Sequence, residues 1–314
     1  MNRIDIAGAG AFGTALAIAL ARGGAGVTLW ARAGAADIDA ARENAKRLPG
    51  HTLPGTVRVT GDLSDLTADI LLLAIPTQKL ADFLALMPPR TGTILSCAKG
   101  IHKATGQSPS ALIRAHAPEA TTGALTGPSF AADIAAGLPT ALTLACADEA
   151  RGAALQDRLS TPMLRLYRST DLVGAELGGA LKNVIAIAAG AVMGAGLGES
   201  ARAALMARGF AEMRRVAALQ GARDETLAGL SGFGDLVLTC TSDKSRNYRY
   251  GLALGAGAPA DPDMTVEGIA TAEELSAHPD LDTPIAAAVA ALSRGQITVQ
   301  DVIATLLNRP LKPE

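Results

Sequence analysis

The chain has 314 residues, of which 49% are hydrophobic and 18% are charged, and its formal net charge at pH 7 is −2. This length accommodates two domains with hydrophobic cores, and this composition excludes an intrinsically disordered protein. The balanced charge, without a long basic run, argues against nucleic acid as a partner. The three cysteines form no CxxC pair and have no histidine nearby, which predicts reduced thiols, no metal site and a cytoplasmic location.

Short apolar runs alternate with helical patterns in the first half of the chain. We expect strands over residues 3–7, 27–30, 70–75, 93–98, 122–125 and 140–145, and helices over residues 12–22, 35–47, 77–87, 105–116 and 129–136. Residues 70–75 (ILLLAI) are apolar throughout and stop at Pro76, as expected of a central parallel strand that is buried on both faces. The alternation predicts the α/β class, with an N-terminal Rossmann-type, doubly wound parallel sheet.

The pattern changes after Thr170, where strand-like runs almost disappear and helical spacing continues to the C-terminus. We therefore expect a dinucleotide-binding domain over residues 1–170 and an all-helical substrate and catalytic domain over residues 171–314. Residues 181–197 are apolar and almost long enough to cross a bilayer, but Lys182 and Asn183 stand at the start of this run. This arrangement predicts a buried helix rather than a membrane span.

A glycine motif follows the first expected strand. Gly8, Gly10 and Gly13 form G-x-G-x-x-G in the sequence GAGAFG, between that strand and an expected helix. In a dinucleotide-binding turn, the first glycine permits the tight turn, the second lets the backbone approach the pyrophosphate, and the third lets helix and strand pack closely. The alternative is an ordinary turn in a glycine-rich protein. The strand–turn–helix context favours a dinucleotide whose phosphates meet the helix N-terminus.

The end of the second expected strand bears on the choice of cofactor. NAD-specific sites place Asp or Glu there to hold the ribose 2′-hydroxyl. Here the strand ends with Trp30-Ala31-Arg32, and the next acidic residue is Asp37. Because a guanidinium matches the geometry of a 2′-phosphate, Arg32 favours NADP(H), with NAD(H) as a second cofactor. The alternative is a solvated surface arginine.

Polar residues interrupt the apolar helix in the segment ELGGALKN, residues 176–183. Gly178 and Gly179 precede Lys182 by one turn, where small residues let another backbone or a ligand come close. A buried lysine can titrate near neutral pH, because burial disfavours its charged form. Lys182 is therefore a candidate to protonate a carbonyl oxygen as hydride arrives, and to remove that proton in reverse. The alternative is a lysine that extends from a helix end into solvent.

Further candidates lie where expected strands and turns end. Asp235 follows the turn SGFG and precedes a helix, so it orients Lys182 or Lys99, contacts a substrate hydroxyl, or caps the helix. Lys99 follows one expected strand, and Gly127 and Ser129 follow another. In open α/β sheets the carboxyl ends of strands face the ligand, which makes these three residues candidates for a binding site.

The segment Ser245-Arg246-Asn247 stands at an expected helix start. A helix N-terminus with these side chains suits an anion, particularly a phosphate monoester. The alternative is simple helix capping beside a solvated charge.

Several segments together resemble bacterial NAD(P)-dependent glycerol-3-phosphate dehydrogenases. They are GAGAFGTALA, CAKGI, TGPSFAADIAAGLPTA, ELGGALKNVIAIAAG, GFGDLVLTCTSDKSRN and VEG, and they extend from Gly8 to Gly268. The GPSFA, KNVIAI and LTCTSxxSRN segments are far more specific than the glycine motif. The resemblance implies reversible reduction of dihydroxyacetone phosphate, a small phosphorylated substrate, to sn-glycerol 3-phosphate, which feeds glycerophospholipid synthesis. We also expect a homodimer.

The same resemblance implies roles for individual residues. It makes Lys182 the proton donor and acceptor, with Lys99 and Asp235 as the other catalytic residues. The implied substrate-binding residues are Lys99, Gly127, Ser129, Lys182, Asp235, Ser245, Arg246 and Asn247. The implied cofactor-binding residues are Gly8, Gly10, Ala11, Phe12, Gly13, Arg32, Lys99, Ala131, Arg246, Val266 and Glu267.

The chain departs from the family pattern at three places. Ala11 stands where the family often has a small hydroxyl residue, Arg47 stands where it often has an aromatic, and the segment before Val266 looks shortened. These departures bear on cofactor affinity and preference rather than on the reaction. Two rival functions stay open: a β-hydroxyacid or 2-ketoacid reductase of similar layout, and a catalytically silent NADP-sensing protein. The presence of both Lys182 and Asp235 argues against the silent protein.

Overall fold

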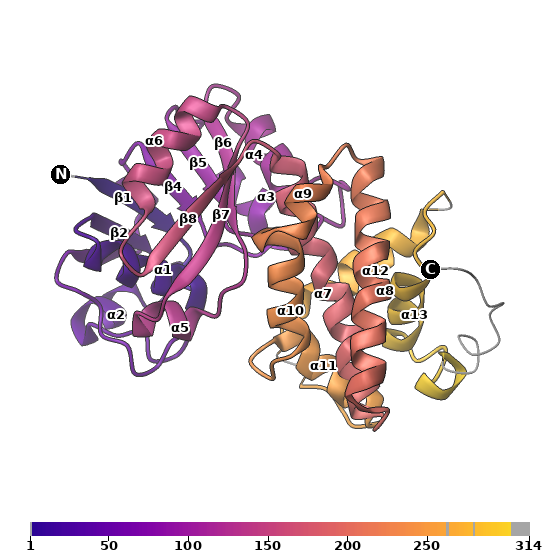
Figure 1. The fold of residues 1–314 in the computed structure, drawn as a ribbon. Helices are drawn as coiled ribbons and strands as arrows, with labels where there is room; N and C mark the ends of the chain where they lie inside the picture. Colours follow the sequence, from indigo (N-terminus) through magenta and orange to yellow (C-terminus); the bar gives the residue numbers. More distant parts are fainter. Residues whose placement is uncertain (1, 262–263, 279, 303–314) are drawn as a thin grey trace. The chain divides into compact units, whose positions relative to one another are not determined.

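A computed structural model describes residues 2–261, 264–278 and 280–302 (Figure 1). The chain forms two compact units. The first, here the sheet unit, contains the residues up to Gly179 and also Gly221–Asp235. The second, here the helical unit, contains Ala180–Gln220 and the residues from Leu236 onward. The helical pattern expected over residues 303–314 lies outside the described residues.

An eight-stranded sheet forms the centre of the sheet unit, with the order β3-β2-β1-β4-β5-β6-β7-β8. The strands are β1 (Arg3–Ala7), β2 (Gly26–Trp30), β3 (Val57–Thr60), β4 (Ile70–Leu73), β5 (Thr93–Ser96), β6 (Thr121–Thr126), β7 (Thr140–Cys146) and β8 (Leu164–Ser169). Neighbouring strands are parallel except β6 and β7, which are antiparallel. The strand order reverses between β1 and β4, which confirms the doubly wound Rossmann-type sheet.

Helices cover both faces of this sheet (Figure 1). They are α1 (Ala11–Arg22), α2 (Ala35–Ala41), α3 (Thr77–Leu86), α4 (Pro109–His116), α5 (Ala131–Ala136) and α6 (Glu149–Leu159). The unit also contains α9 (Asp224–Ala228) and short turns at Leu63–Asp65 and Leu230–Gly234. Alternate residues of β4 supply the two cores: Leu72 packs in the cluster of α1, α5 and α6, whereas Leu71 and Leu73 pack with α3 and α4. Burial on both faces explains why this strand is apolar throughout.

The structure differs from our expectations for this unit at four elements. The helix expected over residues 35–47 ends at Ala41, because Arg42 has a left-handed φ of 53° and its guanidinium bonds Asp39 and the carbonyls of Pro54 and Val57. The strands β3 and β8 and the helix α6 were not expected. In β8 only Leu164 and Leu166 are buried, and Arg165, Tyr167 and Arg168 are exposed, so the strand has too few apolar residues to be recognised in the sequence.

Every element described in the helical unit is a helix, as expected. The unit contains the later part of α7 (Leu172–Gly194), α8 (Gly198–Leu219), most of α10 (Asp235–Cys240), α11 (Arg246–Gly255), α12 (Glu267–Ala277) and α13 (Pro284–Ser293). Glycines bring α7 and α11 into backbone contact: a Cβ added at Gly190 would strike the carbonyl of Tyr248, and one at Gly251 would strike that of Ile187. Helices α7 and α11 therefore form a tightly packed pair.

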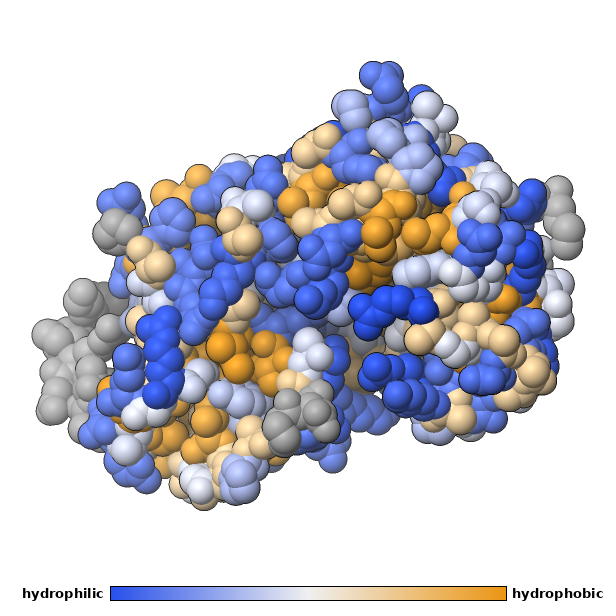
Figure 2. Space-filling model, turned by 180° about the vertical axis from the view of Figure 1, so that it is seen from behind, coloured by the Kyte–Doolittle hydropathy of each residue, from blue (hydrophilic) through white to orange (hydrophobic). Residues whose placement is uncertain are grey.

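Helix α7 is longer than the apolar run suggested, since it begins at Leu172. By length and composition it could cross a membrane, but 72% of its most apolar window is buried inside the protein, as in a core helix. The face shown in Figure 2 carries hydrophobic residues in separate groups among hydrophilic ones. These observations agree with our expectation of a buried helix rather than a clear membrane span.

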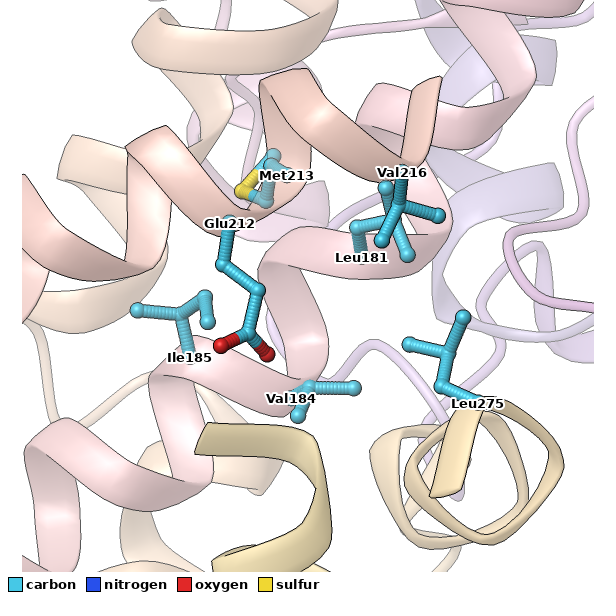
Figure 3. A pocket seen from close by; sticks show the side chains of 7 residues that line it. All are labelled: Leu181, Val184, Ile185, Glu212, Met213, Val216 and Leu275. Atoms are coloured by element: carbon cyan, nitrogen blue, oxygen red, sulfur yellow. The ribbon is translucent and has the colours of Figure 1, made fainter. Parts of the chain in front are cut away.

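A small cavity in the helical unit is lined by Leu181, Val184, Ile185, Glu212, Met213, Val216 and Leu275, and Figure 3 shows these side chains around it. The charged member, Glu212, is buried and accepts hydrogen bonds from the backbone N–H groups of Ile285 (2.9 Å) and Ala286 (3.0 Å). These amides belong to the first turn of α13, which has no side-chain N-cap of its own. Glu212 thus serves as a cap supplied by another helix, and none of the described lining residues is a candidate site residue.

Candidate active site

The glycine turn joins β1 to α1. Gly8 has a φ of +111°, and a Cβ there would lie 2.5 Å from the carbonyl oxygen of Ala74 on the neighbouring strand segment. A Cβ at Gly13 would strike the carbonyl oxygen of Gly8 and lie 2.9 Å from the Cβ of Ala74. Both glycines are therefore required by the turn and its packing.

The second glycine is different. Among the described residues, no atom lies within 4 Å of a Cβ built at Gly10. Gly10 is the N-cap residue of α1 and carries no side chain that could cap the helix. The turn thus leaves open space directly at the first amides of a twelve-residue helix, and this cradle fits a dinucleotide pyrophosphate.

A residue that we did not select from the sequence fixes this turn. The buried Asn44 donates hydrogen bonds from Nδ2 to the carbonyl of Ala9 and to Oγ1 of Thr14, both at 2.9 Å. The contacts span about thirty residues of sequence, so local pattern could not identify them. Ala11 and Phe12 follow the turn at the start of α1 and pack against the sheet core.

Arg32 lies two residues beyond the end of β2. Its side chain is exposed, and no hydrogen bond or ion pair to it occurs within the described parts of the chain. The guanidinium is therefore available for an anionic ligand, although the same exposure also suits a solvated surface arginine.

Lys99 and Asp235 form an ion pair in the sheet unit. Lys99 follows β5, and its Nζ lies 2.6 Å from Oδ2 of Asp235 and donates a 3.2 Å hydrogen bond to the carbonyl of Gly127. The Asp235 side chain is only 2% exposed, whereas that of Lys99 is 18% exposed. Lys99 is one of the two lysines that we considered as partners of Asp235, and the structure shows this pairing. The lysine keeps a limited access to solvent.

The segment after β6 lies beside the Lys99–Asp235 pair and contributes Gly127 and Ser129. Gly127 has a φ of +139°, which favours glycine, and its carbonyl accepts from both Lys99 and the hydroxyl of Ser129 (3.3 Å). Ala131 begins α5 four residues later and is partly buried. The sheet unit therefore brings together Lys99, Gly127, Ser129 and Asp235, as candidate residues of one site.

Lys182 lies in the middle of α7, which corrects our placement of it at the start of a helix. Its side chain is 6% exposed, and its Nζ donates a 2.6 Å hydrogen bond to Oγ1 of Thr239 in α10. A lysine that extends into solvent from a helix end is therefore excluded. Thr239 belongs to the LTCTS segment, but nothing local in the sequence marked it as the partner of a lysine 57 residues away.

A chain of amides connects three helices of the helical unit. Asn247 Nδ2 donates to Oδ1 of Asn183, and Asn247 Oδ1 accepts from the backbone N–H of Gly268, both at 3.0 Å. All three residues are buried. Helix α12 has Val266 as its N-cap residue and begins at Glu267, and Gly268 is its second residue. The bonds of Asn247 tie α7, which carries Lys182, to the VEG segment.

The start of α11 contains the remaining candidates. Ser245 is the N-cap residue, and its Oγ accepts from the N–H of Tyr248 (3.2 Å), so its hydroxyl caps the helix. Arg246 is exposed at the first position of the helix. The capping alternative thus holds for the Ser245 side chain. The exposed guanidinium and the helix N-terminus stay suited to an anion.

Two family models match most of the chain. One describes the N-terminus of NAD-dependent glycerol-3-phosphate dehydrogenase and matches residues 3–152, and the other describes its C-terminus and matches residues 171–304. Proteins from Jannaschia sp. (strain CCS1) and Paracoccus denitrificans (strain Pd 1222), both named glycerol-3-phosphate dehydrogenase (NAD(P)+), are 60% and 57% identical to this chain. The alignments cover 99% of this chain and 100% and 99% of the relatives.

A solved structure agrees with these relatives. The crystal structure of glycerol-3-phosphate dehydrogenase from Coxiella burnetii has a TM-score of 0.92 and 33% sequence identity, and it covers 98% of this chain and 99% of its own. Fold, sequence and the arrangement of the glycine turn lead to one assignment. The chain belongs to the NAD-dependent glycerol-3-phosphate dehydrogenase family.

Proposed function

We propose that this chain catalyses the reversible reduction of dihydroxyacetone phosphate to sn-glycerol 3-phosphate. The observation that carries the proposal is the buried Lys182, held by Thr239, in a chain whose sheet unit has an open glycine turn. When bound, NAD(P)H supplies the hydride that reaches the ketone carbon. Lys182 Nζ gives a proton to the oxygen as its negative charge develops, and takes the proton back in the reverse reaction.

Further candidate residues hold the substrate. Lys99 is a cation beside the buried carboxylate of Asp235. Its ammonium group binds a substrate oxygen, and Asp235 fixes the position of this ammonium group. Gly127 and Ser129 also bind the substrate. Arg246 binds the phosphate through its exposed guanidinium, and Ser245 and Asn247 set the helix start from which it extends. This division gives the substrate phosphate and the reacting carbonyl separate partners.

The cofactor is NADP(H) in preference to NAD(H). Arg32 is exposed, has no described protein partner and lies beyond β2, where a 2′-phosphate binds in such sheets. The further cofactor residues are Gly8, Gly10, Ala11, Phe12, Gly13, Lys99, Ala131, Arg246, Val266 and Glu267. The open space at Gly10 supports the pyrophosphate position.

We further propose that the protein is a cytoplasmic homodimer whose product, sn-glycerol 3-phosphate, is used in glycerophospholipid synthesis. We also propose a domain boundary near residue 170. The gap between the two matched family segments, residues 3–152 and 171–304, supports a boundary in this region. The three buried cysteines agree with a reducing compartment.

Oxidation of NADPH and NADH with a set of ketones tests the proposal. Dihydroxyacetone phosphate should support turnover, whereas dihydroxyacetone and short 2-ketoacids should be poor substrates. Preferred turnover of a 2-ketoacid would favour the hydroxyacid reductase rival instead. Binding of NADPH without turnover of any of these ketones would favour a sensing protein.

A further inference from the structure

Two adjacent glycines of α7 lie against the surroundings of the Lys99–Asp235 pair. Gly178 and Gly179 belong to the part of this helix that is included in the sheet unit. The sequence predicts that small residues here let another backbone or a ligand approach. The contacts identify what approaches: a turn that leads to Asp235 on one side, and the side chain of Lys99 on the other.

Gly178 faces the turn that precedes Asp235. A Cβ at this position would lie 2.6 Å from the carbonyl oxygen of Ser231 and 3.0 Å from the Cα of Gly232. Both atoms belong to the π-helical turn Leu230–Gly234, which leads directly into Asp235. Such turns are uncommon and occur frequently at functional sites. Because the obstacle is backbone, a side chain at position 178 has to displace the turn and, with it, the Asp235 carboxylate.

Gly179 faces the other partner. A Cβ there would lie 3.3 Å from Cγ and 3.6 Å from Cδ of Lys99, and 2.9 Å from Oγ1 of Thr126. Thr126 is 4% exposed, and its hydroxyl has no hydrogen-bond partner among the described residues. The Lys99 stem therefore crosses the helix over Gly179, between α7 and the end of β6. A methyl group at this position has to displace the Thr126 hydroxyl and push the Lys99 stem away by a few tenths of an ångström.

We propose that Gly178 and Gly179 are positioning residues for the Lys99–Asp235 ion pair, Gly178 through the carboxylate and Gly179 through the ammonium. The two charged groups are 2.6 Å apart, and the carboxylate is buried. A small displacement therefore weakens their attraction, and water cannot fully replace the lost interaction at the buried carboxylate. The expected loss of activity rests on the proposed function, in which this pair binds substrate. The expected displacement of Lys99 does not depend on that function.

The displacement of Lys99 can be measured without activity. The chain contains seven lysines, so the side-chain ammonium groups of full-length protein labelled with ¹⁵N-lysine give a short NMR spectrum, in which Lys99→Arg identifies Lys99. We expect the Lys99 resonance to move toward the positions of exposed lysines in Gly178→Ala and in Gly179→Ala. An unchanged Lys99 resonance in both folded variants would overturn the assignment.

Two further variants make this test specific. Gly209→Ala is the matched control, since the three atoms nearest to its added Cβ all belong to the side chain of Ile185. It should lower stability and leave the Lys99 resonance in place. Adding Thr126→Ala to Gly179→Ala removes the 2.9 Å contact and should return the Lys99 resonance part of the way. If Gly178→Ala does not fold, Gly179→Ala still decides the question, because its obstacles are side chains.

Kinetics separate this inference from the proposed function. In the otherwise unchanged protein, Gly178→Ala should lower kcat/KM for dihydroxyacetone phosphate about 10–100-fold, as expected for a misplaced catalytic group. In an Asp235→Asn background the same change should lower it less than about twofold, since the pair is already broken. Equal losses in both backgrounds would overturn the positioning role. A displaced Lys99 with unchanged kcat/KM would support the geometry and overturn the role proposed for the pair.

Discussion

Lys182 and Thr239 form a 2.6 Å hydrogen bond inside the helical unit, and both side chains are buried. The bond connects the middle of α7 to α10, so two helices fix the direction of the ammonium group. A long, flexible lysine side chain needs such a partner to present its proton at one point, because its rotamer freedom is otherwise large.

The Thr239 hydroxyl should therefore matter for turnover rather than for substrate affinity. Thr239→Val keeps the shape and removes the acceptor, and we expect kcat to fall about 10–100-fold with a smaller change in KM. Thr239→Ser should retain most of the activity, because it keeps the hydroxyl. Steady-state kinetics with dihydroxyacetone phosphate test this, and equal kcat values for the valine and serine variants would contradict it.

Arg32 should decide between the two dinucleotides. Its exposed guanidinium has no protein partner in the described residues, so Arg32→Ala removes a ligand contact and leaves the packing unchanged. We expect the KM for NADPH to rise about 10–100-fold, because the variant loses one or two charge-assisted hydrogen bonds to the cofactor. The KM for NADH is the internal control and should stay within about twofold. A variant with unchanged preference for NADPH would show that the 2′-phosphate binds elsewhere.

The sequence predicted the sheet well where burial alone determines the pattern. The central strand β4 is apolar throughout because both of its faces are covered, and the glycine turn is recognisable because backbone geometry demands glycine at positions 8 and 13. Prediction from the sequence failed where contacts between distant residues determine where an element ends. The end of α2 at Arg42 depends on carbonyls that lie 12 and 15 residues further along the chain, and local spacing cannot show them.

The candidate site follows the same division. Lys99 and Asp235 were both selected from the sequence, but only the fold brings together residues that are 136 positions apart. Thr239 and Asn44 were not selected, since a threonine in a helix and an asparagine after one have many ordinary roles. Their importance comes from the atoms they reach, and those belong to distant segments.

Glu212 should contribute to stability as the cap of α13. Its carboxylate accepts two backbone N–H groups of that helix, so Glu212→Ala leaves both amides unpaired and should lower the free energy of unfolding by about 1–3 kcal/mol. Glu212→Gln should lose less, because it keeps one acceptor. Glu199→Ala, on an exposed position of the same helix, is the control and should leave the denaturation midpoint unchanged.

The same residue predicts a pH dependence. Burial raises the pKa of Glu212 above its ordinary value of 4.5, even though the amides of Ile285 and Ala286 oppose this shift. The folded state therefore favours the protonated form. The resulting contribution to stability is fully present below pH 4.5 and is lost as the pH rises through the raised pKa. Relative to Glu212→Gln, the wild-type protein should become less stable across this window in urea denaturation. A constant difference would contradict the shift.

The central claim is that Lys182 transfers the proton, and the turnover of Lys182→Ala measures it most directly. NADPH oxidation with saturating dihydroxyacetone phosphate should be about 10²–10⁴-fold slower than in the wild-type protein, the usual contribution of a general acid. NADPH binding, followed by its fluorescence, should stay within about twofold and shows that the variant is folded. Near-normal turnover with NADPH bound would contradict the account.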